Sequence, residues 1–185
     1  MLVYRVFPHL PAAGPDEPGH PLYVRPDQGT GRWDNADLYR AMYVAASASG
    51  AIGEAFANLS TWSRAMLPFP SIMGSSRSIG VYRVDEERHP FLNLDDARVL
   101  LDRALRPTDV VIRNRPRTQQ LARAVHAEVR WAGMSWWSMH RPQWTLHVLW
   151  DGTALTVEGV ESLPGHPGLL DAARLLAKRV DADIA

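Results

Sequence analysis

The stretch MYVAASASGAIGEAFANL at residues 42–59 places a short apolar run directly before a helix-forming segment. The run at 42–44, Met-Tyr-Val, is typical of a strand. Ser49 then offers an N-cap, so we expect a helix from there to about Leu59. A strand that leads straight into a helix in this way indicates a domain that contains both kinds of element.

The expected helix has one apolar side. Ile52, Phe56 and Leu59 follow one another at intervals of four and three residues, which predicts a buried stripe. Glu54 lies about 200° around the helix axis from Ile52, at about 100° per residue. We therefore expect the Glu54 carboxylate to face solvent or a cleft.

Strands are expected near both ends of the chain, with helices between them. Residues 2–7 alternate between two largely apolar faces, which predicts a strand with Arg5 pointing inward. This arrangement favours an α+β fold: one compact domain over 1–185, with a mixed, mainly antiparallel sheet flanked by helices. The other expected elements are a strand at 78–84, a helix at 95–105, a strand at 110–112, a helix at 117–131 that Gly133 ends, a strand at 144–150, its hairpin partner at 153–160 after the Asp151-Gly152 turn, and a helix at 167–180.

A proline-rich connection follows the first strand. Prolines recur from Pro8 to Pro26 together with glycines, and nothing in this segment has the period of a helix or a strand. Loops of such length in compact domains are usually functional or mobile. We interpret the segment as a flap over a cleft.

Composition narrows the class of protein. With 185 residues and 46% hydrophobic content, the chain can form one domain with a substantial core. Twenty basic and twenty acidic residues give no net charge, which argues against a general attraction to nucleic acid or to an anionic membrane. The absence of cysteine, of a signal-like start and of a long apolar stretch predicts a soluble cytoplasmic protein. The seven histidines lack ligand spacing, so no metal site is expected.

Two arginines and a glutamate form the candidate site. Burying Arg5 between apolar neighbours requires an anion, which is either a carboxylate of the protein or a ligand. Arg32 follows the glycines of Gly29-Thr30-Gly31, which allow a ligand to approach the backbone, and the indole of Trp33 could stack on a planar group. With Glu54 in the same cleft, these groups would bind a doubly charged small molecule that carries hydroxyls.

Other clusters have simpler interpretations. The arginines at 113–117 could form a nucleic-acid patch, but a solvated turn fits the neutral chain better. Four tryptophans between 131 and 144 indicate core or interface packing rather than a sugar-binding platform.

An ordered set of short motifs resembles the RES domain family, which is named for its arginine, glutamate and serine. The likeness runs from about residue 3 to about residue 155, and residues 156–185 add a strand end and the C-terminal helix. The resemblance implies an α/β fold similar to that of ADP-ribosyltransferase toxins. The motifs are Tyr4-Arg5, Gly31-Arg32-Trp33, Tyr43-x-x-x-Ser47-x-x-x-Ala51-x-x-Glu54 and Gly133-x-x-x-x-Ser138.

The resemblance also implies a site and a substrate. Members of the family act on NAD+, without a metal. Glu54 would stabilise positive charge on the ribose, the two arginines would bind the diphosphate, Tyr43 would lie near the nicotinamide, and Ser138 would donate to ribose or phosphate. The family commonly has an arginine two residues after the serine, where this chain has His140. The implied catalytic residues are Arg32, Tyr43, Glu54 and Ser138, and Arg5 and His140 join them in binding.

The implied activity is that of a toxin from a toxin–antitoxin pair. It would cleave the nicotinamide–ribose bond of NAD+, as a glycohydrolase or a phosphorylase. One alternative is ADP-ribosyl transfer to a protein target, and another is a non-catalytic domain that binds a partner through its tryptophan- and arginine-rich surface. The expected partner is an antitoxin, a small helical DNA-binding protein; self-association is possible, and no direct contact with nucleic acid or membrane is expected.

Overall fold

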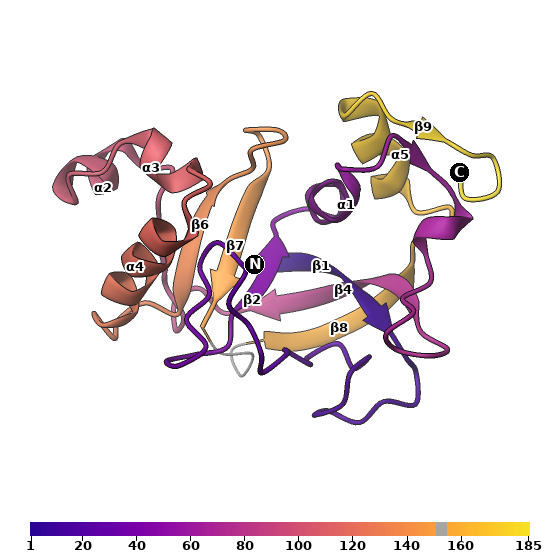
Figure 1. Ribbon diagram of the computed structural model, residues 1–185, viewed down its shortest axis with the longest axis horizontal. Coiled ribbons are helices and arrows are strands. Elements are labelled where there is room, and N and C mark those ends of the chain that lie inside the picture. Colours follow the sequence, from indigo (N-terminus) through magenta and orange to yellow (C-terminus); the bar gives the residue numbers. More distant parts are fainter. Residues whose placement is uncertain (151–154) are drawn as a thin grey trace.

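The computed structural model describes residues 1–150 and 155–185, and a seven-stranded sheet is its centre (Figure 1). The strand order is β5-β6-β7-β2-β1-β4-β8, and only the β5–β6 pair in this sheet is parallel. The expected α+β class with a mainly antiparallel sheet is therefore confirmed. The strands are β1 (Leu2–His9), β2 (Met42–Ala45), β4 (Ser76–Val84), β5 (Phe91–Asn93), β6 (Gly133–Trp137), β7 (Thr145–Leu149) and β8 (Leu155–Ser162).

Two groups of helices flank the sheet. In Figure 1, α2, α3 and α4 lie beside β6, whereas α1 and α5 lie together near the β1–β4–β8 half of the sheet. A second, two-stranded parallel sheet joins β3 to β9 next to α5. The bounds are α1 (Ala48–Phe56), α2 (Ala97–Asp102), α3 (Pro107–Val111), α4 (Arg115–His126), α5 (Pro167–Leu175), the 3-10 helix η1 (Arg64–Met66), β3 (Thr61–Trp62) and β9 (Arg179–Val180).

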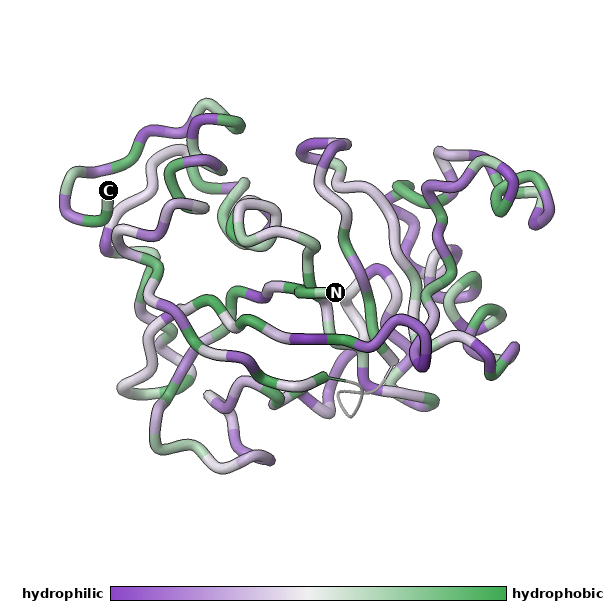
Figure 2. Tube along the Cα trace, turned by 180° about the vertical axis from the view of Figure 1, so that it is seen from behind, coloured by the Kyte–Doolittle hydropathy of each residue, from purple (hydrophilic) through white to green (hydrophobic). Residues whose placement is uncertain are grey.

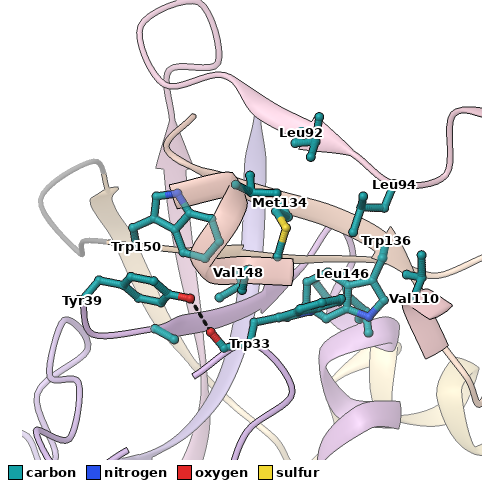
Figure 3. Close-up of a cluster of buried hydrophobic side chains, with 14 of the residues drawn as sticks. Trp33, Tyr39, Leu92, Leu94, Val110, Met134, Trp136, Leu146, Val148 and Trp150 are labelled. Atoms are coloured by element: carbon teal, nitrogen blue, oxygen red, sulfur yellow. Dashed lines mark hydrogen bonds between the residues drawn. The ribbon is translucent and has the colours of Figure 1, made fainter. Parts of the chain in front are cut away.

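Apolar side chains pack on both faces of the sheet. On one face, Tyr4 and Val6 of β1 contact the two clusters that α1, α4 and α5 cover. Their neighbour Val3 belongs to a third cluster on the opposite face, as strand alternation requires. Figure 3 shows the first of these clusters, and in Figure 2 hydrophobic and hydrophilic segments alternate along the strands.

Helix α1 forms where the sequence predicts a helix, but both of its ends differ, and it ends at Phe56 rather than at about Leu59. The N-cap is Ser47, not Ser49: the Ser47 Oγ accepts a hydrogen bond of 3.0 Å from the Gly50 amide. Ile52 and Phe56 are buried, which confirms this part of the predicted stripe, whereas Leu59 lies beyond the helix and is half-buried. Glu54 is exposed on another side of the helix, as its spacing predicts.

The segment between β5 and β6 differs from the prediction. Residues 110–112 do not form a strand, because Pro107 opens helix α3 and the Asp109 carboxylate accepts from the Arg106 amide, 2.9 Å away, at the helix start. Helix α4 ends at His126, so the expected helix to 131 was too long. Gly133 does not end that helix; it begins β6, where a side chain would lie 1.9 Å from the Val148 carbonyl oxygen.

The C-terminal part pairs differently as well. Strand β8 joins β4, not β7, because both edges of β7 are already occupied by β2 and β6. The predicted turn at Asp151-Gly152 lies outside the described residues. The last helix ends at Leu175 rather than near 180, and Arg179–Val180 forms β9 instead.

The proline-rich segment does not cover the cleft beside Glu54. Leu22 and Val24 pack in the third cluster, on the face of the sheet opposite to α1, and the Tyr82 hydroxyl donates to the Pro21 carbonyl across 2.8 Å. The segment lies away from that cleft, because apolar residues at its end are anchored in the core. The segment lines a separate hollow of about 420 Å³ that Arg5 also borders.

Candidate active site

Two adjoining hollows meet beside helix α1. The first has a volume of about 270 Å³ and lies where β1 and β2 diverge; the second, of about 530 Å³, extends toward α4. Both are within or close to the size range of small-molecule sites. The residues that line both hollows are Tyr43, Glu54, Trp136 and Leu146.

The carboxylate of Glu54 lies at this junction and is held in place by Ser138. The Ser138 hydroxyl donates a short hydrogen bond to Glu54 Oε1. Ser138 is fully buried, and its oxygen also accepts from the amides of His140 at 3.0 Å and Arg141 at 3.2 Å. All hydrogen-bonding positions of the serine hydroxyl are thus occupied by the protein. One oxygen of Glu54 is fixed in place and the other remains available to the hollows.

Arg32 projects into the second hollow from the loop that precedes β2. Its Nη1 donates to the carbonyl oxygens of Val110 at 2.9 Å and Ile112 at 2.6 Å, and its Nη2 contacts the Met139 sulfur at 3.1 Å. These partners are neutral and orient the guanidinium without forming an ion pair with it. Burial lowers the pKa of Arg32, and the charge of Arg115 lowers it further.

A buried carboxylate, Asp34, fixes the Arg32 loop. It accepts hydrogen bonds from the amides of Gly29 at 3.0 Å and Gly31 at 2.6 Å, and from the Tyr43 hydroxyl at 2.7 Å. A side chain at Gly31 would lie 2.3 Å from Asp34 Oδ1, so this close approach requires glycine. Burial and the neighbouring Asp34 raise the pKa of Tyr43, which keeps the phenol neutral. The Tyr43 hydroxyl is therefore held by Asp34, while the ring borders both hollows.

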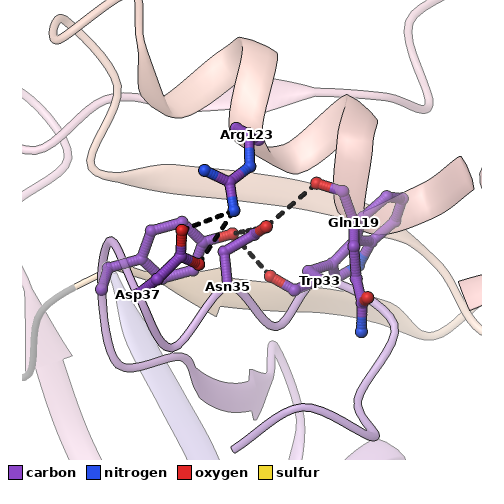
Figure 4. A network of polar contacts seen from close by, with 6 residues as sticks. Trp33, Asn35, Asp37, Gln119 and Arg123 are labelled. Carbon is purple, nitrogen blue, oxygen red and sulfur yellow. Dashed lines mark hydrogen bonds and ion pairs between the residues drawn. The ribbon is translucent and has the colours of Figure 1, made fainter. Parts of the chain in front are cut away.

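Helix α4 supports the same loop. The Gln119 amide donates to the carbonyls of Gly29 and Gly31 at 2.9 and 3.0 Å, and the Thr118 hydroxyl donates to the Arg32 carbonyl at 2.6 Å. Figure 4 shows the neighbouring part of this network, in which Asn35 donates to the Gln119 carbonyl. The position of Arg32 thus depends on a helix more than eighty residues further along the chain.

Arg5 borders the first hollow and is half-buried. Its Nη1 donates to the Tyr23 carbonyl at 3.0 Å, and no ion pair forms at Arg5 among the residues that the structure describes. Burial lowers the pKa of its guanidinium. Within the described part of the chain, the alternative of a structural salt bridge at Arg5 therefore finds no partner.

Trp33 does not have the role considered from the sequence. Its side chain is fully buried in the first cluster and meets the Trp136 ring edge-on at 5.4 Å, so the indole cannot stack on a ligand (Figure 3). The glycine before Arg32 serves the Asp34 contact instead. Trp136, one of the tryptophans expected to pack in the core, does so and also lines both hollows.

Five of the six proposed site residues lie around the junction of the two hollows, whereas Arg5 borders the first hollow and its guanidinium is bound to the Tyr23 carbonyl of the proline-rich segment. Arg32 and exposed His140 border the second hollow, Tyr43 and Glu54 border both, and Ser138 lies directly behind Glu54. Sequence reasoning missed Asp34, whose position after Gly-x-Gly-Arg-Trp gave no sign of its three contacts. It also missed Arg113 and Arg115, since an arginine-rich turn has the same pattern whether it faces solvent or a cavity.

Nowhere in residues 1–150 and 155–185 do three or more His, Cys, Asp or Glu side chains gather in a way that could hold a metal ion. The described helices are all too short or too polar to span a membrane.

Comparison with known proteins gives a family match and a structural neighbour. The profile of the RES domain matches residues 2–166. No curated protein matches the sequence. Among solved structures, a chain from the M. tuberculosis MbcT–MbcA toxin–antitoxin complex superimposes with a TM-score of 0.58 at 16% sequence identity, over 96% of this chain and 89% of the other. At this identity the likeness concerns the fold.

Proposed function

The chain belongs to the RES domain family, and on this premise we propose that it is the toxin of a toxin–antitoxin pair and consumes NAD+ by breaking the bond between nicotinamide and ribose. The observation that carries the proposal is the position of Glu54. Its carboxylate lies where two ligand-sized hollows meet, one of its oxygens accepts from Ser138, Tyr43 lines both hollows with it, and Arg5 and Arg32 each border one of them.

The reaction needs a negative charge at this position. When the glycosidic bond breaks, nicotinamide leaves with the bonding electron pair and positive charge develops on the ribose. A carboxylate that is already oriented stabilises this charge without having to reorganise during the reaction. The free oxygen of Glu54 would also accept from the ribose hydroxyls. When water is the acceptor, it supplies a hydroxyl to the ribose and releases one proton.

The two arginines would bind the diphosphate. Each guanidinium is partly removed from water, and neither forms an ion pair with a carboxylate among the described residues. A phosphate group supplies the missing charge and accepts two parallel hydrogen bonds from each fork. Arg5 and Arg32 border different hollows, so an extended molecule that reaches both is a better fit than a small one.

Tyr43, Ser138 and His140 would serve binding and orientation. The Tyr43 ring lines both hollows and could pack against the nicotinamide ring, while its hydroxyl stays with Asp34. Ser138 would act through Glu54, because its hydroxyl has no free position for a ligand. His140 lines the second hollow, where it could donate to a phosphate in place of the arginine that is common in the family.

The expected partner is an antitoxin protein. The structurally similar chain was solved as part of a toxin–antitoxin complex, and family membership supports the same type of partner here. We propose that the antitoxin covers the two hollows. Co-expression with its antitoxin should then abolish nicotinamide release.

Purified protein incubated with NAD+ should release nicotinamide, and Glu54→Gln should lower the rate by at least a hundredfold, about 2.7 kcal/mol of transition-state stabilisation. The matched control is Glu87→Gln, which changes an exposed glutamate in the β4–β5 turn. Equal rates in Glu54→Gln and the wild-type protein would remove Glu54 from the mechanism. Mass spectrometry of protein in the mixture separates cleavage from ADP-ribosyl transfer.

A further inference from the structure

Three arginines line the second hollow, and their charge is not balanced by the protein around them. Arg32 enters it from the loop before β2, Arg115 is the first residue of α4, and Arg113 precedes the N-cap of that helix. Among the described residues of the lining, Glu54 is the one carboxylate, and its Oε1 already accepts the Ser138 hydroxyl. The hollow therefore carries an excess of positive charge.

Arg115 is the least satisfied of the three. Its Nη1 is buried and has no hydrogen-bond partner within the described part of the chain. A buried donor without a partner is costly, because water no longer solvates it. The charge of Arg115 also helps to lower the pKa of Arg32, so the two guanidinium groups repel each other across the same space.

Other arginines of α4 provide an internal comparison. Arg117 Nη2 lies 2.8 Å from Asp109 Oδ1, and Arg123 Nη2 lies 2.7 Å from Asp37 Oδ2 (Figure 4). These arginines do not line the hollow, and each is paired with an acid of the protein. Arg115 borders the hollow and has no such acid among the described residues. This difference indicates that its partner is an anion from outside the chain.

We propose that Arg115, together with Arg32 and Arg113, forms a binding site for a phosphoryl group in the second hollow. A guanidinium fork binds two phosphate oxygens at once. Because Nη1 itself is buried, a bound phosphate would contact the part of the Arg115 side chain that lines the hollow, and its negative charge would offset the repulsion between Arg115 and Arg32. The phosphoryl group belongs either to the dinucleotide or to free inorganic phosphate; the first source rests on the function proposed above, whereas the site itself does not.

Calorimetric titration with inorganic phosphate and, separately, with NAD+ tests this site. Arg115→Gln should weaken binding of at least one of the two by about tenfold or more, the loss expected for a charge-assisted hydrogen bond. Arg117→Gln is the matched control, because Arg117 lies on the same helix but pairs with Asp109; it should leave both affinities unchanged. Thermal melting checks that each variant is folded. Unchanged affinity of folded Arg115→Gln for both ligands would overturn the proposal.

A competition experiment identifies the source of the phosphoryl group. If phosphate displaces NAD+ and Arg115→Gln weakens both, the site holds a phosphate of the dinucleotide. If phosphate and NAD+ bind together and the variant weakens phosphate alone, the site holds free phosphate. Either result supports the site. If phosphate binds through Arg115 but the protein releases no nicotinamide from NAD+, the phosphate site is supported and the proposed function is refuted.

Discussion

Replacing Ser138 by alanine tests whether the Glu54 carboxylate must be held in position or need only be present. The substitution removes the hydrogen bond to Glu54 and leaves two backbone amides, those of His140 and Arg141, without their acceptor. Glu54 itself remains, but it is free to rotate toward solvent. We therefore expect the variant to fold and to lose catalytic efficiency.

The magnitudes follow from these contacts. A hydrogen bond to a charged group contributes about 1.5–3 kcal/mol, so kcat/KM should fall about ten- to hundredfold. The unsatisfied amides should lower the free energy of unfolding by about 2 kcal/mol, which corresponds to a fall in Tm of about 4–8 °C for a chain of this length. Because the carboxylate stabilises charge that develops only in the transition state, the loss should appear mainly in kcat rather than in KM.

The assay is nicotinamide release at several NAD+ concentrations, with Tm measured on the same samples. Ser135→Ala is the matched control: Ser135, in β6, is buried as Ser138 is, but its hydroxyl lies 3.3 Å from Asn93 Oδ1, and no contact joins it to Glu54 among the described residues. That variant should keep its kcat. The reasoning would be refuted by a folded Ser138→Ala protein with wild-type kcat, or by an equal loss of kcat in Ser135→Ala.

Three further changes test other parts of the structure. Arg5→Ala should weaken NAD+ binding in calorimetry by about 2 kcal/mol while the fold survives; an unfolded variant would instead make Arg5 structural. Asp34→Asn, which can accept at only one oxygen, should lower the free energy of unfolding in urea by about 2 kcal/mol and raise KM through the displaced Arg32 loop, whereas Asp27→Asn at an exposed site should do neither. Burial lowers the pKa of His147 to about 4, below its value of about 6.5 in the unfolded chain, so the unfolded state binds more protons between these values; stability should be full above pH 6.5 and fall by up to about 3 kcal/mol toward pH 4. His147→Leu should remove much of that pH dependence, and its persistence unchanged would count against the assignment.

Local patterns in the sequence were enough to predict most of the elements. The alternation at 2–7 predicted β1, and the stripe of Ile52 and Phe56 predicted α1 with Glu54 on a different side. Such patterns are reliable because they depend on which side of a strand or helix each residue occupies, and neighbours in sequence determine this. Family motifs then added Ser138, which no periodicity would have connected with a residue 84 positions earlier.

The partners of each element depended on the tertiary structure. Strand β8 was predicted as such, but its pairing with β4 rather than β7 depended on which sheet edge was free. The same holds for the site: Arg115 and Arg117 are two residues apart in one arginine-rich turn, yet one borders a hollow and the other pairs with Asp109.

The sequence by itself determined the class of fold, the helix that presents Glu54 and the family to which the chain belongs. Only the tertiary structure decided that Trp33 is buried, that Asp34 holds the Arg32 loop and that Arg115 lacks an acid among the described residues. The physical reason is that burial and charge pairing depend on groups distant along the chain, whose approach is fixed by packing and by free sheet edges rather than by local periodicity.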